Sequence, residues 1–280
     1  MTRIAVTQMT SNDEVDKNLA AVERNLRRSA EGGAALAVVP ECFAYMAREG
    51  EYVSIAESLD EGGPILERCR TMAKTFRLEV IYGGFWEKGA DGRVRNTSLH
   101  MRADGSIAAA YQKIHLFDVD LPDGTKLCES AIVEGGEQAV VTESAAGRIG
   151  MTICYDVRFG ALYDALALAG AQILTVPAAF TLMTGKDHWE VLLRARAIEQ
   201  QCYVAAAAQV GHHRYADGTG ERHSWGHAMI VDPWGVVIAQ CGAGEGVALA
   251  EIDLPALASI RRQLPALRHR VPFAPPADPE

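Results

Sequence analysis

The residue in this sequence that best suits covalent chemistry is Cys154, which follows a short apolar run. Residues 149–153 have a composition typical of a buried strand, and apolar residues recur at helical spacing from Leu162 to Ala169. A cysteine between a strand and a helix lies at the carboxyl edge of a sheet, where open α/β folds bind ligands. The nearby helix N-terminus favours the thiolate form. Cys154 is therefore a candidate nucleophile, and the alternative is a small buried core residue.

Two more polar residues, Glu41 and Lys113, end predicted strands at 36–39 and 106–113. Taken singly, they could be a solvated loop carboxylate and a strand-end lysine. Together with a cysteine they suit amide hydrolysis, because a thiol at its ordinary pKa is mostly protonated and needs a base or a cation. Glu41 can take the thiol proton and later pass it to the leaving amine. Lys113 can stabilise the thiolate and then the tetrahedral oxyanion, together with the backbone N–H of Tyr155.

Other polar clusters offer weaker alternatives. His115 could pair with Cys154 as a Cys–His dyad, although His115 and Lys113 would then share one strand face. Four histidines could bind a metal, but their loop has no cysteine or carboxylate framework at ligand spacing. They are His212, His213, His223 and His227. We therefore expect no metal site.

The elements that must position these residues alternate between strands and helices. Apolar runs predict strands at 4–8, 36–39, 79–84, 149–153, 172–176, 203–208, 225–231, 236–239 and 247–252. Helical periodicity predicts helices at 13–31, 64–76, 162–169, 187–201 and 254–264. Residues 96–102 and 106–113 flank an Asp-Gly turn and predict a hairpin. We expect an α/β fold with two mixed sheets packed face to face and helices outside.

Three segments carry more specific expectations. The polar stretches 115–137 and 212–223 are expected to be loops, the first long enough to have a function. The helix at 187–201 is expected to turn Val191, Ala195 and Ile198 inward. No linker composition interrupts the chain, so we predict one domain over residues 1–270 and a proline-rich tail over 271–280.

Composition limits the partners and the compartment. The 280 residues carry 36 acidic and 27 basic side chains, a net charge of −9, and no basic stripe, which argues against a nucleic-acid partner. No apolar run approaches the roughly 18 residues that cross a bilayer, and no secretory signal precedes the first strand. The six cysteines form no Cys-x-x-Cys pair, which is typical of free thiols in a reducing compartment. We therefore expect a cytoplasmic protein that acts on a small molecule without a membrane partner.

Three ordered blocks of this sequence resemble the signatures of the nitrilase superfamily of carbon–nitrogen hydrolases. They are Pro40-Glu41, residues 111–118 (YQKIHLFD) and residues 154–159 (CYDVRF), and the similarity extends over about residues 3–272. The resemblance implies a four-layer α-β-β-α sandwich that assembles into a homodimer or a higher oligomer. It also implies a catalytic triad of Glu41, Lys113 and Cys154 with no metal or organic cofactor. A further glutamate, Glu129, is implied to orient the lysine.

Within the superfamily, residues 184–199 and 224–235 are most similar to the Nit branch. Residues 200–213 resemble its Nit1 type, which hydrolyses deaminated glutathione to 2-oxoglutarate and Cys-Gly. The alternatives are the ω-amidase type, which acts on 2-oxoglutaramate, and another small aliphatic amidase. We expect a cysteine-dependent amidase that forms a thioester, with substrate contacts at Phe180, Thr181 and His188. A catalytically silent dimeric interaction protein is the remaining alternative, and the complete triad argues against it.

Overall fold

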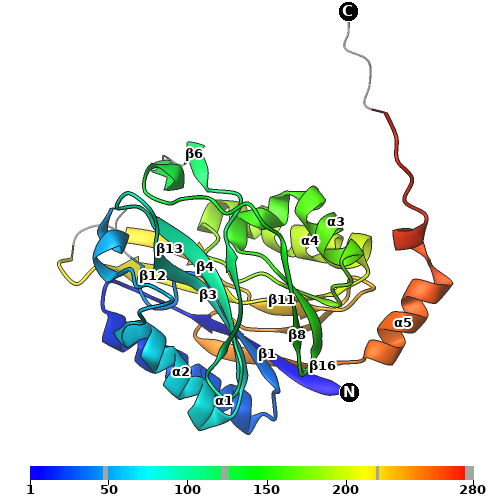
Figure 1. Cartoon of the computed structure of the whole chain (residues 1–280), viewed down its shortest axis with the longest axis horizontal. Helices are drawn as coiled ribbons and strands as arrows, with labels where there is room; N and C mark the ends of the chain where they lie inside the picture. Colours follow the sequence, from blue (N-terminus) through cyan, green and yellow to red (C-terminus); the bar gives the residue numbers. More distant parts are fainter. Residues whose placement is uncertain (47–49, 121–123, 125, 219–220, 275–280) are drawn as a thin grey trace, which may run out of the picture.

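Two β-sheets packed face to face, with helices on both outer faces, form the body of the protein (Figure 1). The computed structural model describes residues 1–46, 50–120, 124, 126–218 and 221–274. The predicted architecture of two mixed sheets in an α/β sandwich is confirmed.

The first sheet is built around β1 and has eight strands. Its strands are β1 (Thr2–Met9), β2 (Leu36–Val39), β3 (Glu79–Lys88), β4 (Val94–Met101), β5 (Ile107–Gln112), β12 (Ala208–Arg214), β13 (Glu221–Trp225) and β16 (Gly246–Ile252). They run in the order β13-β12-β1-β2-β3-β4-β5, and β16 also pairs with β1. β1, β2 and β3 are parallel, so their carboxyl ends meet at one edge of the sheet.

The second sheet has six strands in the order β15-β14-β11-β10-β9-β8. Its strands are β8 (Val140–Ser144), β9 (Gly147–Met151), β10 (Ile173–Thr175), β11 (Tyr203–Ala206), β14 (Met229–Val231) and β15 (Val237–Gln240). β9, β10 and β11 are parallel, and Cys154 follows β9. A two-stranded hairpin, β6 (Asp118–Asp120) with β7 (Lys126–Cys128), lies within the long polar stretch 115–137.

Helices cover the outer face of each sheet, α1 and α2 on the first and α3 and α4 on the second (Figure 1). The helices are α1 (Val15–Glu31), α2 (Pro64–Phe76), α3 (Gly160–Leu168), α4 (Leu182–Gln200) and α5 (Leu254–Gln263). Four 3₁₀ helices join them, η1 (Glu51–Ile55), η2 (Glu129–Ala131), η3 (Cys154–Arg158) and η4 (Ala266–Arg268). Strand alternation separates two cores, since Ile4 and Val6 pack between the sheets while Ala5 packs under α1. In the part of the chain that the structure describes, no helix is long and apolar enough to cross a bilayer.

The predicted inner face of the long helix is wrong. On α4, Val191 and Ile198 are 67% and 51% exposed. The buried face instead carries polar side chains that find partners, since Arg196 Nε donates to the Val157 carbonyl at 3.0 Å and Gln200 Nε2 donates to Asp164 Oδ1 at 2.8 Å. The same face also carries Trp189, Leu193 and Ala197, which are buried in the core at a spacing of four residues.

The predicted loop at 212–223 is wrong at both ends, because residues 212–214 and 221–223 belong to strands. β12 and β13 form an antiparallel hairpin in which His212 lies opposite His223. The apolar run that predicted one strand at 203–208 is divided between two sheets, because β11 ends at Ala206 and β12 begins at Ala208. Of the predicted proline-rich tail, residues 275–280 lie outside the described residues, and the single-domain boundary stays a prediction.

Candidate active site

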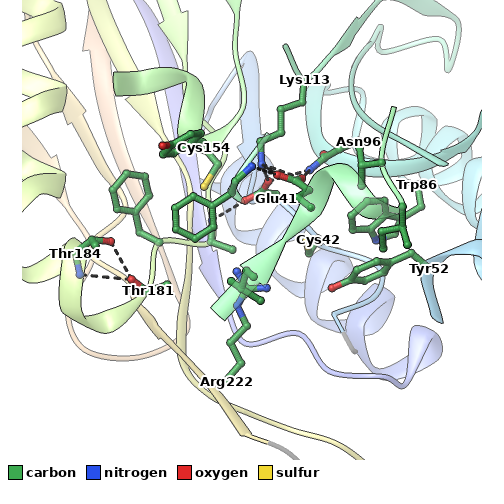
Figure 2. A pocket seen from close by; sticks show the side chains of 18 of the residues that line it. Glu41, Cys42, Tyr52, Trp86, Asn96, Lys113, Cys154, Thr181, Thr184 and Arg222 are labelled. Carbon is green, nitrogen blue, oxygen red and sulfur yellow. Dashed lines mark hydrogen bonds and ion pairs between the residues drawn. The ribbon is translucent and has the colours of Figure 1, made fainter. Parts of the chain in front are cut away.

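Cys154 opens the 3₁₀ helix η3, shortly after the end of β9. Its N–H donates to the carbonyl of Pro177 at 2.9 Å, and its φ of +47° is a left-handed conformation that side chains rarely adopt. Asp156 holds this turn, because its carboxylate accepts from the Ile153 N–H at 2.8 Å and from the Tyr111 hydroxyl at 2.7 Å. The sulfur points into a cavity beside Glu41 (Figure 2). Such strained backbone is common at functional sites.

Glu41 follows β2 and is buried, with both carboxylate oxygens in use. Oε1 accepts from Lys113 Nζ at 3.0 Å and from Asn96 Nδ2 at 2.9 Å. Oε2 accepts from the backbone N–H of Ala179 at 3.0 Å. The Cys154 thiol lines the same cavity and is close enough to interact electrostatically with this carboxylate. Glu41 therefore lies beside the nucleophile and is hydrogen bonded to the cation of the predicted triad (Figure 2).

A bulge in β3 makes room for Glu41. The register of β3 against β4 shifts between Tyr82 and Phe85, where Gly84 has a φ of +67°. A Cβ on Gly84 would lie 2.5 Å from the Cys42 nitrogen and 2.9 Å from Glu41 Cγ. Only glycine fits here, because any side chain would meet both the unfavourable φ and the backbone that carries Glu41.

Lys113 follows β5 and is held between two carboxylates. Its Nζ donates to Glu41, and to Glu129 Oε1 and Oε2 at 3.0 and 2.8 Å. Glu129 is itself positioned by the Phe117 N–H at 2.7 Å, and Asn96 Nδ2 reaches it at 3.2 Å. The side chain implied to orient the lysine therefore contacts it directly.

The buried charges determine where the protons reside. Burial opposes ionisation of Glu41, but the charge of Lys113 and the hydrogen bonds from Cys154 and Asn96 outweigh it and lower the pKa of the carboxyl. Burial also opposes the ammonium form of Lys113, yet Glu129 and Glu41 raise the pKa of Lys113 well above its usual value. Burial and the negative charge of Glu41 raise the pKa of the Cys154 thiol well above its usual value, and Lys113 offsets this only in part.

The resting site thus holds a neutral thiol beside an ionised carboxylate. The sequence predicted that a helix N-terminus would favour the thiolate. Burial and the charge of Glu41 outweigh that effect and favour the neutral thiol. A thiolate would add a second uncompensated negative charge to Glu41, Glu129 and Lys113, which together already carry one. The thiol can therefore attack only as its proton passes to Glu41.

The cavity around this cluster has aromatic and cationic walls. Tyr52, Trp86 and Phe117 line it, and Phe180 and Thr181 lie at the start of α4. Two guanidinium groups also line it, those of Arg158 and Arg222. Among residues 1–46, 50–120, 124, 126–218 and 221–274, neither arginine has an ion-pair partner. A partly apolar pocket with two cations that lack a carboxylate partner suits a small anionic ligand.

The model of the carbon–nitrogen hydrolase family matches residues 3–262. The chain belongs to this family. Deaminated glutathione amidase from Homo sapiens is 44% identical over 275 residues, 96% of this chain and 82% of the relative. The protein of that name from Synechocystis is 43% identical over 271 residues, 95% of this chain and 97% of the relative. The predicted membership of the nitrilase superfamily is confirmed, and the protein is a hydrolase of carbon–nitrogen bonds in amides.

A solved structure shows the same arrangement. The Caenorhabditis elegans NitFhit protein matches with a TM-score of 0.88 and 39% identity, over 96% of this chain and 65% of that chain. This chain therefore spans about two thirds of the NitFhit chain, and the match agrees with a four-layer α-β-β-α sandwich.

The remaining predicted site residues of this carbon–nitrogen hydrolase differ in whether they line the cavity. Phe180 and Thr181 line the cavity, as predicted for substrate contacts. His188 does not line it, because α4 turns this side chain outward, where its Nδ1 lies 3.3 Å from Arg158 Nη1. Nor does His115 line it, and the Cys–His alternative fails because His115 Nδ1 lies 2.8 Å from Asp156 Oδ1 and its ring stacks on Phe159.

The four histidines considered as metal ligands are engaged elsewhere. His213 is buried between the Ser11 carbonyl at 2.7 Å and the Ser224 hydroxyl at 2.9 Å. The His212 and His223 rings lie 3.7 Å apart, and His227 stacks on Trp225. In the described ranges, no group of three or more histidine, cysteine or carboxylate side chains could hold a metal ion.

Sequence reasoning missed several residues of the site. Among them, Asn96 bridges Glu41 and Glu129, Cys42 lies beside Glu41, and Arg222 lines the cavity from β13. Asn96 looked like an ordinary strand residue, and Arg222 belonged to a stretch interpreted as a loop. The strand alternation of β13 would have placed Arg222 on one face, but only the hairpin register shows which face that is.

Proposed function

We propose that this protein hydrolyses deaminated glutathione to 2-oxoglutarate and Cys-Gly through a thioester on Cys154. The observation that carries this proposal is the placement of Cys154, Glu41 and Lys113 in one cavity, where Lys113 Nζ donates to Glu41. Relatives that are 40–44% identical to this chain over the aligned residues are deaminated glutathione amidases, which supports the choice of substrate.

In the first half of the reaction, the Cys154 proton passes to Glu41 while sulfur attacks the amide carbon. The carbonyl electron pair becomes an oxyanion, which the charge of Lys113 and the N–H of Tyr155 stabilise. Tyr155 lies in the first turn of η3, where backbone N–H groups have no partner within the helix. Protonation of Glu41 weakens its hydrogen bond from Lys113, so that an ammonium proton becomes available to the oxyanion. Collapse of the intermediate breaks the C–N bond, and Glu41 gives its proton to the leaving amine.

The second half returns the enzyme to its starting state. Glu41, again ionised, takes a proton from water as the water oxygen attacks the thioester carbon. The C–S bond breaks, the acid product leaves, and the sulfur recovers its proton from Glu41. Throughout, Glu129 and Asn96 keep Lys113 and Glu41 in contact.

The acyl part of the substrate carries a carboxylate, for which Arg158 is the suitable partner. Arg158 lies four residues beyond the nucleophile in the sequence. Its guanidinium lies 5.3 Å from the centre of the Phe180 ring and 5.8 Å from the centre of the Tyr155 ring. A carboxylate on Arg158 would hold the 2-oxo acid chain across the apolar wall, with its amide carbon at Cys154.

We also propose that the protein assembles as a homodimer through the outer face of α4. Val191 and Ile198 on α4 lie on the same side of the helix, and Trp234 and Val236 are 62% and 51% exposed on the turn before β15. This turn packs on α4, since Arg194 Nε donates to the Gly235 carbonyl at 2.8 Å. We call these four apolar residues the α4 patch.

The cytoplasmic localisation stays a prediction.

The test of the proposed reaction compares two substrates and one variant. Purified protein is given deaminated glutathione or 2-oxoglutaramate, and Cys-Gly and ammonia release are measured in parallel. We expect a higher kcat/KM for deaminated glutathione, and we expect Cys154→Ala to lower it by about 10⁴-fold or more. Intact mass after rapid quenching should show an acyl adduct on the unsubstituted enzyme and none on Cys154→Ala.

Three results would contradict the proposal. A strong preference for 2-oxoglutaramate would make the protein an ω-amidase. Full activity of Cys154→Ala would exclude the thioester. If neither amide were hydrolysed, the substrate would have to be a different amide.

A further inference from the structure

A second cation of the cavity, Arg222, extends from β13 and has no role in the proposed chemistry. The register of β13 places it opposite His213, and its side chain points into the cavity (Figure 2). Its Nε is buried and has no hydrogen-bond partner among the residues that the structure describes. A buried guanidinium without a partner costs free energy, and a bound carboxylate would remove that cost.

Arg222 lies on the Glu41 side of the nucleophile. Burial opposes the charged form of Arg222, but Tyr52, Cys42 and Glu41 are close enough to raise the pKa of its guanidinium. Cys42 is the chain neighbour of Glu41, and both side chains are seen beside Arg222 in Figure 2. Arg158 has different neighbours. Its guanidinium packs on the ring of Tyr155, which follows the nucleophile, and on the ring of Phe180, which precedes α4.

The acyl part and the leaving amine of the substrate must lie on different sides of Cys154. Glu41 must lie beside the leaving nitrogen, because it gives that nitrogen its proton. The rest of the leaving amine therefore extends along the wall that Glu41, Cys42 and Tyr52 share with Arg222. The acyl chain occupies the side of Arg158.

We propose that Arg222 binds a terminal carboxylate of the leaving amine, so that it selects amides of amino acids or short peptides over primary amides. This inference rests on the proposed function and adds the recognition of the leaving group. The charges agree with it: Lys113 is paired with Glu41 and Glu129, which leaves two cations for a substrate with an anionic group at each end. A primary amide such as 2-oxoglutaramate would leave Arg222 without a carboxylate partner and its buried Nε without a hydrogen bond.

The test measures binding to Cys154→Ala, which cannot form the thioester. The probes are deaminated glutathione and its analogue with a carboxyl-terminal amide, which differ by one carboxylate. Isothermal calorimetry should show the carboxylate binding about 10- to 100-fold more tightly, the range of a charge-assisted hydrogen-bonded pair. In the double variant Cys154→Ala with Arg222→Gln, the ratio of the two affinities should fall to about 1, because the charge that binds the carboxylate has been removed.

Arg158, the other arginine that lines the cavity, supplies a matched control. Arg158→Gln in the same background should weaken both ligands to the same extent and keep their ratio. Arg222→Lys, which retains a charge but not the planar fork, should give an intermediate ratio and serves if Arg222→Gln does not fold. A ratio that survives Arg222→Gln, or the absence of any preference before substitution, would overturn the inference.

This experiment also separates the inference from the proposed function. If the unsubstituted enzyme does not hydrolyse deaminated glutathione but the binding ratio depends on Arg222, the proposed function fails and the inference stands. If hydrolysis occurs and the ratio does not depend on Arg222, the inference alone fails. If neither probe binds, both are wrong.

Discussion

At the scale of single residues, the site depends on the position of one proton. Glu41 has a lowered pKa and Cys154 a raised one, so the thiol keeps its proton until a substrate carbonyl is in place. This protects a buried cysteine from adventitious reaction. It also means that Glu41 has two opposite effects on the sulfur, since it accepts the thiol proton but its charge disfavours the thiolate.

Glu41→Gln should separate these two effects. Loss of the base should lower kcat by about 10²–10⁴-fold. Because the charge of Glu41 raises the pKa of Cys154, its removal should lower that pKa and shift the pH midpoint of Cys154 alkylation by iodoacetamide downward. The variant should thus be less active yet more easily alkylated at neutral pH, as measured by peptide mass mapping.

Glu87→Gln is the matched control for this substitution. Glu87 is a mostly buried carboxylate on β3 that accepts from Thr97 and does not line the cavity. Its substitution should not move the alkylation midpoint. An unchanged or raised midpoint in Glu41→Gln would show that the charge of Glu41 does not hold the thiol neutral.

At the scale of elements, strand ends and one bulge set the geometry of the triad. Glu41 follows β2 and Lys113 follows β5 in the first sheet, while Cys154 follows β9 in the second. The three side chains meet because the sheets pack face to face. The β3 bulge at Gly84 then allows the backbone of Glu41 and Cys42 to pass close to β3.

Gly84→Ala should displace Glu41. It adds the cost of a left-handed alanine, about 1–2 kcal/mol, to a contact with backbone that cannot move aside easily. We expect the free energy of unfolding, measured by urea titration, to fall by more than about 2 kcal/mol and kcat to fall by about 10-fold or more.

Gly92→Ala supplies the control, because Gly92 has a similar φ of +75° but no atom within 4 Å of its Cβ position. It should show the cost of the left-handed alanine alone and keep full activity. Equal stability losses in the two variants, with activity retained in both, would mean that the bulge does not position Glu41.

At the scale of the whole molecule, the proposed dimer explains an unusual exposure of apolar side chains. The α4 patch (Val191, Ile198, Trp234 and Val236) would be costly to leave in water, and burial against a second copy would remove that cost. The surface is the same on both subunits, as a twofold axis requires.

The double substitution of Val191→Glu and Ile198→Glu should therefore halve the mass measured by light scattering. Two charges in an apolar interface oppose association, whereas on a monomer both side chains remain in water. Val53→Glu, which changes an exposed apolar residue of η1 outside the α4 patch, is the control and should leave the mass unchanged. A monomer before substitution, or a dimer after it, would place the interface elsewhere or exclude it.

The sequence by itself determined the elements and the positions of the reactive residues. β2 and α2 have the predicted bounds, and Cys154, Glu41 and Lys113 were placed at strand ends from apolar runs alone. These predictions succeeded because strand composition and chain breaks are local properties. The ordered motifs then indicated the family, which the matching family model shows.

Only the tertiary structure decided which side chains share the cavity and how their charges interact. The raised thiol pKa depends on burial and on Glu41, which is far away in the sequence. On the buried face of α4, Arg196 and Gln200 hydrogen bond to other elements, beside the core residues Trp189 and Leu193. Arg222 enters the pocket through the register of a hairpin that its polar composition concealed. These are long-range pairings, and neither periodicity nor spacing along the chain records them.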